Sequence, residues 1–226
     1  MRSLGSFDPF PPTEMADTDG LLLVGGQLSP DWLLAAYRRG IFPWPVLYGK
    51  REILAWFSPD PRAVIELDQL HVPSRLARRM RGGQFQFTFD RDFRQVIRAC
   101  AEPRRRESQT WITSSMIRAY ERLHELGFAH SVEVWQMGEL VGGLYGVALG
   151  GFFAGESMFH RERDASKAAV VRLVEHLRER GFHLFDIQQQ TPHMAAMGAV
   201  ELPRREFLRR VRAAVTVDVR FTKETD

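Results

Sequence analysis

Three polar side chains interrupt two otherwise apolar segments of the sequence and could act on a substrate. Glu156 lies in the run Gly155–Phe159, and Asp186 and Gln188 lie in the run Leu184–Gln188. Side chains of a strand alternate between its faces, so Asp186 and Gln188 share one face with their Cα atoms roughly 6.5–7 Å apart. A carboxylate in an apolar strand must be paired or solvated in a cleft, because leaving it buried and unpaired is costly.

These side chains could meet if the two strands are neighbours in one sheet. Alternation also places Met158 on the face of Glu156, so the polar groups would converge within an apolar wall. Such a site suits binding a cation or accepting a proton. The alternative is that each acid forms an ion pair with one of the many arginines, and the residues alone leave both readings open.

Four aromatic residues form a second candidate cluster. Trp44 lies in a proline-flanked turn, Trp111 precedes an expected helix, and Tyr37 and Tyr120 lie on expected helices. Aromatic rings interleaved with arginines suit unpaired nucleic-acid bases, for which stacking contributes about 1–3 kcal/mol per base. Single tryptophans more often pack in a core, so this reading needs support from elsewhere in the chain.

Several common functional motifs are absent from the sequence. There is no Walker loop, no G-x-G-x-x-G opening a helix after a strand, and no H-E-x-x-H. His124 and His130 lack partners at metal-ligand spacing, and the single cysteine, Cys100, lies on an apolar helical face. We therefore expect neither a metal site nor a cofactor.

Composition narrows the class of protein. The chain has 226 residues, of which 44% are hydrophobic and 26% charged, and this composition is typical of a globular protein with a substantial core. No apolar run approaches the roughly 18 residues that cross a bilayer, and the first residues lack the apolar region of a signal peptide. We expect a cytoplasmic protein without a membrane partner.

The charge is unevenly distributed along the chain. The formal net charge is +3, but residues 73–106 contain ten arginines against three acids, a surplus of seven that leaves the remainder at −4. A segregated basic surface indicates a polyanion partner, because arginines pair with phosphates and release counterions. Arginine is also the default cation of this chain, which has only three lysines, so charge alone does not decide the point.

Helix- and strand-breaking residues and hydrophobic periodicity predict two domains of mixed α+β or α/β class. Residues 1–62 are rich in proline, glycine and aromatics and are expected to form a small N-terminal α/β domain, followed by a larger domain at 63–226. Hydrophobic spacing and capping residues predict helices over 31–39, 92–101, 113–126, 165–180 and 204–214. Strands are predicted over 130–137, 140–149, 151–159 and 183–188.

Taken together, these segments resemble the bacterial leucyl/phenylalanyl-tRNA–protein transferases. The matching pieces are Gly20–Leu22, Gly25–Pro30, Ala36–Trp44, Phe57–Arg62, Thr110–Thr113, Ala129–Trp135, Leu140–Gly146, Gly155–Phe159, Ala165–Lys167 and Asp186–Gln188 with His193.

The resemblance implies a fold, an activity and partners. It implies a larger domain similar to the acetyltransferase (GNAT) fold, and transfer of Leu or Phe from a charged tRNA to the N-terminal Arg or Lys of a protein, which marks that protein for degradation. The donors would be Leu-tRNA and Phe-tRNA, with leakage to Met-tRNA because one methylene is discriminated by only about 1–3 kcal/mol. An aminoacyl ester is already activated, so no ATP is needed and we expect no cofactor. We also expect the enzyme to be a monomer.

The resemblance also assigns roles to matching residues. The catalytic group would be Asp186, Gln188 and Glu156. The pocket for the esterified side chain would be Leu144, Phe153, Met158, Val170, Leu173 and Phe185. The terminal adenosine of the tRNA would lie against Trp44 and Trp111, completed by Tyr37 and Tyr120. The tRNA backbone would meet Arg75, Arg78, Arg79 and Arg81.

The expected mechanism needs only a modest base. The attacking α-amine has a pKa near ~7.7–8.0. We expect Asp186 to accept a proton or to orient the amine through Gln188, and Glu156 to hold the α-ammonium or the basic side chain of the acceptor. A route assisted by the tRNA's own ribose hydroxyl is equally compatible.

Departures from the family pattern concern the donor pocket, and two other classes of protein stay in view. Asp164, Leu144 and Phe57 stand where Asn, Met and Trp are more usual, which leaves the preference for Leu or Phe open. An acyl-CoA-dependent acetyltransferase would need a glycine-rich turn before the helix at 165, and residues 161–166 contain no glycine. A non-catalytic tRNA-binding module would not need acids within apolar strands.

Overall fold

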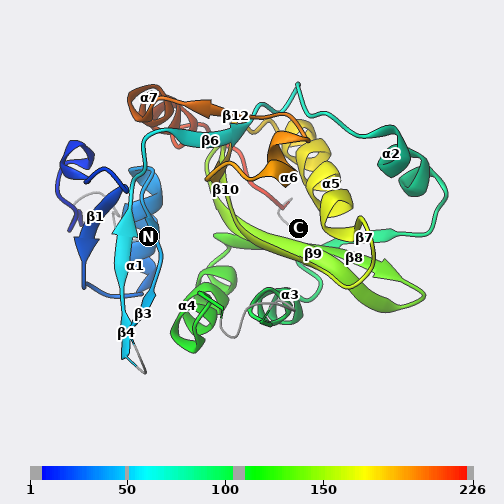
Figure 1. Ribbon diagram of the computed structural model, residues 1–226, viewed down its shortest axis with the longest axis horizontal. Coiled ribbons are helices and arrows are strands. Elements are labelled where there is room, and N and C mark those ends of the chain that lie inside the picture. Colours follow the sequence, from blue (N-terminus) through cyan, green and yellow to red (C-terminus); the bar gives the residue numbers. More distant parts are fainter. Residues whose placement is uncertain (1–6, 49–50, 104–109, 223–226) are drawn as a thin grey trace.

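A small sheet and a large sheet organise the chain (Figure 1). The computed structural model describes residues 7–48, 51–103 and 110–222, and the side chains of 47 and 48 are not described. The small sheet has three strands in the order β1-β5-β2, and β3 and β4 form a separate two-stranded ribbon. The bounds of these elements are η1 (Thr13–Met15), β1 (Leu21–Val24), β2 (Phe42–Pro43), β3 (Val46–Tyr48), β4 (Arg51–Ile53) and β5 (Ala55–Phe57).

The large sheet has seven strands in the order β12-β6-β11-β10-β9-β8-β7. All neighbouring pairs are antiparallel except β10 and β11, which are parallel. The strands are β6 (Arg62–Ile65), β7 (Gln86–Phe89), β8 (Ala129–Gln136), β9 (Glu139–Leu149), β10 (Phe152–His160), β11 (Leu184–Gln188) and β12 (Ala199–Leu202). This mixed sheet with helices on both faces confirms the expected fold class.

Helices cover both faces of the large sheet (Figure 1). One face packs against α5, with α2 beside α5, and the other face packs against α3 and α4. The helices are α1 (Pro30–Arg38), α2 (Ser74–Arg81), α3 (Phe93–Cys100), α4 (Ser114–Glu125), α5 (Ala165–Glu179), α6 (Pro192–Ala195) and α7 (Arg204–Ala214). Two clusters of buried apolar side chains result: a first cluster on the α3/α4 side and a second cluster on the α5 side.

Local sequence signals explain where several helices begin. Ser29 and Thr113 accept hydrogen bonds from backbone amides of α1 and α4, as expected of N-cap residues. The predicted helices and strands agree with the observed ones to within one or two residues at most ends. Strands β6, β7 and β12 and helix α2 were not predicted. In α2 only Leu76 and Met80 are large and apolar, so its periodicity is too sparse to stand out.

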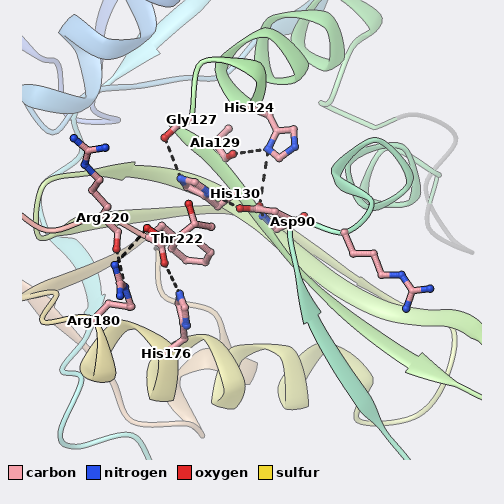
Figure 2. A network of polar contacts seen from close by, with 12 residues as sticks. Asp90, His124, Gly127, Ala129, His130, His176, Arg180, Arg220 and Thr222 are labelled. Carbon is pink, nitrogen blue, oxygen red and sulfur yellow. Dashed lines mark hydrogen bonds and ion pairs between the residues drawn. The ribbon is translucent and has the colours of Figure 1, made fainter. Parts of the chain in front are cut away.

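The C-terminal segment packs between β8 and α5, and its hydrogen bonds to His176 and Arg180 are drawn in Figure 2. The ring of buried Phe221 stacks on His130 at 4.3 Å, and the Nε2 atom of His176 hydrogen-bonds to the Phe221 carbonyl at 2.7 Å. The guanidinium of Arg180 donates to the Arg220 carbonyl at 2.9 Å. The Nδ1 atom of His130 lies 2.7 Å from an Asp90 carboxylate oxygen. This histidine therefore contacts both the residue that directly follows β7 and the C-terminal segment.

The N-terminal part is continuous with the large sheet through the first cluster. That cluster contains Leu33 and Tyr37 of α1 together with Phe93 of α3 and Val147 of β9. Arg62, placed at the end of the expected small domain, is the first residue of β6 in the large sheet. A domain boundary between residues 62 and 63 stays a prediction.

Candidate active site

A cavity opens where two strands of the large sheet stop pairing. Strands β10 and β11 pair in register from Phe152–Leu184 to Ala154–Asp186 and no further. Beyond that point lies a cavity of about 410 Å³ lined by residues of both strands, including Glu156 and Gln188. Two of the three side chains predicted to converge do so: Gln188 Nε2 donates to Glu156 Oε1 at 3.2 Å, whereas Asp186 does not line the cavity.

One side of the cavity is apolar and belongs to the second cluster. Four of the six predicted pocket residues line it: Leu144, Met158, Val170 and Phe185. Ile187 of β11 and Met194 of α6 line it as well and were not predicted. Helix α6 is too short to give a periodic signal. An apolar wall of this kind can receive an aliphatic or aromatic side chain.

Phe153 and Leu173 do not line the cavity, which corrects the prediction for both. Each side chain is fully buried in the second cluster. The Phe153 ring stacks on Phe221 at 5.5 Å and meets the edge of Phe185 at 5.8 Å, so it supports the wall from behind.

A β-bulge places Glu156. The register with β9 shifts between Gly155–Gly146 and Ser157–Tyr145, so one extra residue stands in β10 at this point. Met158 consequently packs against the second cluster, whereas Glu156 hydrogen-bonds to Tyr120, which belongs to the first. The predicted sharing of one face by Glu156 and Met158 is wrong because alternation fails across a bulge.

Glu156 is a carboxyl group whose pKa lies near neutral pH. Burial raises its pKa from 4.5 to about 7, against the lowering effect of hydrogen bonds from Tyr37 and Tyr120. The Tyr120 hydroxyl donates to Glu156 Oε2 at 2.9 Å. An acid with a pKa near the pH of a cell can exchange a proton with a substrate, and such groups are typical of active sites.

Tyr37 and Tyr120 do not present rings to the cavity, which corrects the expectation that they stack on a base. Both side chains are fully buried, and neither lines the cavity. Their hydroxyls hydrogen-bond to each other, and burial raises the pKa of each well above 10. Both phenols therefore stay protonated, and the Tyr120 hydroxyl holds Glu156.

Asp186 lies behind the cavity wall. It is fully buried and forms a two-pronged ion pair with Arg62, with Arg62 Nε 2.8 Å from Oδ1 and Nη2 2.7 Å from Oδ2. Its Oδ1 also accepts the backbone N–H of Gln188 at 2.9 Å. The ion-pair alternative for this acid is thus observed, and Asp186 is not among the residues that line the cavity.

Gln188 is held in an uncommon backbone conformation. Its φ is +59°, in the left-handed region, and the pairing of β11 with β6 shifts register between Asp186 and Gln188. Such strain persists only where the surroundings over-determine it. The hydrogen bond from the Gln188 backbone to Asp186 supplies that constraint and aims the amide side chain at Glu156.

Trp44 and Trp111 lie together on the other side of the cavity. Their rings stack with centroids 4.8 Å apart and planes 17° apart, and both line the cavity. They are 67 positions apart in the sequence, and only the packing of the small sheet against the loop before α4 brings them into contact. A flat aromatic surface is thus present where a base could stack.

Comparison with known proteins decides the family. The profile of the leucyl/phenylalanyl-tRNA protein transferases matches residues 64–212, and that of the N-terminal domain of the same family matches residues 26–60. The leucyl/phenylalanyl-tRNA–protein transferase of Stutzerimonas stutzeri is 55% identical over 88% of this chain and 87% of its own length. That of Syntrophobacter fumaroxidans is 56% identical over 88% of this chain and 84% of its own length. The chain belongs to the leucyl/phenylalanyl-tRNA–protein transferase family.

Membership makes the chain an aminoacyl-tRNA–protein transferase, an enzyme of the acyltransferase class. Among solved structures, L-PGS from Bacillus licheniformis is similar with a TM-score of 0.41 and 14% identity, over 77% of this chain. The match spans 57% of that longer chain. Within the described residues, no helix of the transferase is long and apolar enough to cross a membrane.

The arginines of α2 in the transferase divide into two kinds. Arg75, Arg78 and Arg81 are more open to solvent, whereas Arg79 is turned towards the protein and its side chain is 22% exposed. Arg79 lies 3.6 Å from Glu162 and over the ring of Phe85 at 5.0 Å. Three of the four arginines predicted to contact the tRNA backbone are therefore open to a polyanion. The arginines at 104, 105 and 106 lie outside the described residues.

Proposed function

We propose that this transferase moves Leu or Phe from aminoacyl-tRNA to the N-terminal Arg or Lys of a protein. The observation that carries the proposal is the two-sided cavity. One side is apolar, and the charged side chains among its described lining residues are Glu102 and Glu156, both acidic. An apolar side chain and a cationic amine could therefore meet at Glu156.

The reaction balances without an energy source. The acceptor's amine nitrogen attacks the carbonyl carbon of the aminoacyl ester and forms the peptide C–N bond. The C–O bond to the ribose breaks, and the proton lost by the amine ends on the ribose oxygen. The amine must be neutral to attack, and its pKa near ~7.7–8.0 means that a weak base suffices.

The donor would lie with its side chain on the apolar wall. Leu144, Met158, Val170 and Phe185 would contact the Leu or Phe side chain. The stacked pair of Trp44 and Trp111 offers a surface for the terminal adenosine. This orientation directs the ester carbonyl towards Glu156 and Gln188, which lie between the two sides.

Glu156 is the best candidate for the group that binds or deprotonates the amine. Its raised pKa lets it hold an ammonium when ionised and carry a proton when neutral. Gln188 would orient the carbonyl or the amine, and Asp186 would act through Gln188 as a positioning residue rather than as the base. A proton route through the ribose hydroxyl is compatible with these positions.

The partners follow from the same reading. The exposed arginines of α2 would contact the tRNA backbone, and the acceptors would be proteins with N-terminal Arg or Lys. Their modification would mark them for degradation in the cytoplasm, with the enzyme acting as a monomer. Met-tRNA would be a weak donor because the apolar wall discriminates poorly between side chains of similar size.

The test is transfer of radiolabelled Leu from Leu-tRNA to a peptide that begins with Arg. We expect label in the peptide with Leu-tRNA or Phe-tRNA, and none when acetyl-CoA is the donor. The same peptide beginning with Glu is the matched control for the acidic cavity. Acetyl transfer would identify an acetyltransferase, and binding of tRNA without transfer would identify a non-catalytic module; either result sinks the proposal.

A further inference from the structure

Tyr145 has a buried hydroxyl that nothing in the described part of the protein satisfies. Its side chain is fully buried, and its hydroxyl oxygen has no hydrogen-bond partner. Among the described residues with such an orphaned atom, Tyr145 is the one that lines the cavity. A buried polar group without a partner is costly, and its presence on a cavity wall points to a ligand atom that satisfies it.

The ring that carries this hydroxyl is held rigidly. It meets Phe93 edge-on at 5.9 Å and Tyr120 edge-on at 5.5 Å, both within the first cluster. Burial, followed by the neighbouring charge of Glu156, raises the pKa of Tyr145 well above 10, so the group stays a phenol. It can therefore donate one hydrogen bond and accept others at a fixed position.

Tyr145 and Glu156 line the same cavity, and the charge of Glu156 acts on the Tyr145 hydroxyl. Tyr145 is the register partner of Ser157, directly after the bulged Glu156, on strands that lie about 4.8 Å apart. The two groups nevertheless form no hydrogen bond with each other. Both stand on the first-cluster side, away from the apolar wall of Leu144 and Met158.

Counting donors and acceptors limits what can bind there. Glu156 Oε2 accepts a hydrogen bond from Tyr120 and Oε1 accepts one from Gln188, and Tyr37 also acts on this carboxyl group. A carboxylate has about four acceptor sites, so at least one of them stays free. The Tyr145 oxygen offers lone pairs too. A group that bridges the two residues must donate to the ionised Glu156 and can either donate to Tyr145 or accept from it. A primary amine meets this requirement, because it has a hydrogen for each oxygen; a carbonyl oxygen has none to donate to Glu156.

We propose that Tyr145 Oη and the Glu156 carboxyl together bind the α-amine of the acceptor's N-terminal residue. The inference rests on the proposed function and adds a substrate-contacting residue that the sequence did not indicate. Tyr145 would accept one N–H while Glu156 accepts another, which leaves the nitrogen lone pair of the neutral amine directed at the ester carbonyl. Recognition is thus of the amine itself, separate from the side chain of the acceptor.

The test is Tyr145→Phe, which removes the hydroxyl and keeps the ring. At saturating Leu-tRNA, we expect the KM for an Arg-initiated peptide to rise about tenfold, since one hydrogen bond to the bound amine is removed. The kcat and the KM for Leu-tRNA should stay within about twofold of the wild type. The melting temperature should not fall, because an unsatisfied buried group has been removed.

Two controls separate recognition from structure. Ser58→Ala removes another buried, unpartnered hydroxyl, one that does not line the cavity, and should change neither KM. Calorimetric binding of the peptide with a free N-terminus should weaken about tenfold in Tyr145→Phe, whereas binding of the N-acetylated peptide should be weak and equal in both proteins.

Several outcomes would overturn the inference while leaving the proposed function intact. If wild-type enzyme transfers Leu and Tyr145→Phe shows an unchanged peptide KM, the hydroxyl does not bind the amine. If only the KM for Leu-tRNA rises, the hydroxyl belongs to the donor site. If the wild type transfers no Leu at all, the proposed function fails, and the calorimetric comparison of free and acetylated peptide still decides whether Tyr145 recognises an amine.

Discussion

At the scale of single residues, the cavity depends on Glu156, a carboxyl group that is largely desolvated but still hydrogen-bonded. Tyr120 and Gln188 each donate one hydrogen bond to it, which favours the ionised form, and burial opposes ionisation more strongly. The result is a pKa of about 7. A group poised there can release or take up a proton during one catalytic cycle.

Glu156→Gln tests this role through the pH dependence of transfer. Wild-type kcat/KM should rise with pH through an apparent pKa near 7, because only the ionised carboxylate holds or deprotonates the amine. The variant should be slower by about 100-fold and should lose that inflection. A variant with the wild-type profile would remove Glu156 from the mechanism. Glu102→Gln is the matched control on the cavity rim, where the side chain is exposed and paired with Arg161 at 2.8 Å.

The same variant should change stability in the opposite direction. A raised pKa means that the group's contribution is present in full below about pH 4.5 and is lost as the pH rises through about 7. At pH 9 the free energy of unfolding of Glu156→Gln should therefore exceed that of the wild type by up to roughly 3 kcal/mol, so the variant unfolds at a higher denaturant concentration. Near pH 4 the two proteins should be equal. Urea melts at both pH values measure the difference.

At the scale of elements, two irregular strands make the site. The bulge in β10 and the left-handed turn at Gln188 in β11 occur just where the parallel pairing of the two strands ends. Regular strands would have continued the ladder and closed the space between them. The irregularities therefore create the cavity and aim Glu156 and Gln188 across it.

The arginines of helix α2 lead to a separate prediction about the salt dependence of tRNA binding. Replacing Arg75, Arg78 or Arg81 with Ala should weaken tRNA binding and lower the salt slope of log K by about 1 for each phosphate left without its arginine. Arg79→Ala is the matched control, since Arg79 pairs with Glu162 and should leave the slope unchanged. Filter binding at several salt concentrations measures the slopes. Equal slopes for all four variants would place the tRNA elsewhere.

At the scale of the whole molecule, Arg62 joins parts that are far apart in sequence. Its guanidinium lies 4.6 Å from the ring of Phe42 in the small sheet and 4.6 Å from the ring of Phe207 in α7, and it pairs with Asp186 in β11. Both charged groups are almost completely buried. Their desolvation is offset only while the pair is intact.

Arg62→Ala should destabilise the protein by about 3–5 kcal/mol, because it leaves Asp186 buried without a counter-charge. The double variant Arg62→Met with Asp186→Leu should recover much of that stability, since apolar groups of similar size need no counter-charge. It should still be a poor enzyme because the Gln188 backbone no longer has its acceptor. Guanidinium melts report the stability; a double variant no more stable than Arg62→Ala would contradict this account.

The sequence by itself determined the elements and the family. Apolar spacing and capping residues are local properties, so the helix at 165–179 and the long strands of the large sheet follow from them. The polar residues within apolar strands were visible for the same reason, and Glu156 and Gln188 do meet in the cavity. The separate segments that resemble the transferases were also enough to identify the family.

Only the tertiary structure decided which of these side chains line the cavity. The bulge that separates Glu156 from Met158 is set by pairing with β9, and alternation along one strand carries no sign of it. Arg62 and Asp186 are 124 positions apart, so their pairing is a consequence of sheet order. Burial of Tyr37 and Tyr120, and the unpartnered buried hydroxyl of Tyr145, likewise depend on packing between distant elements. Spacing records what a chain can place on one face, whereas long-range packing decides which groups remain open to a ligand.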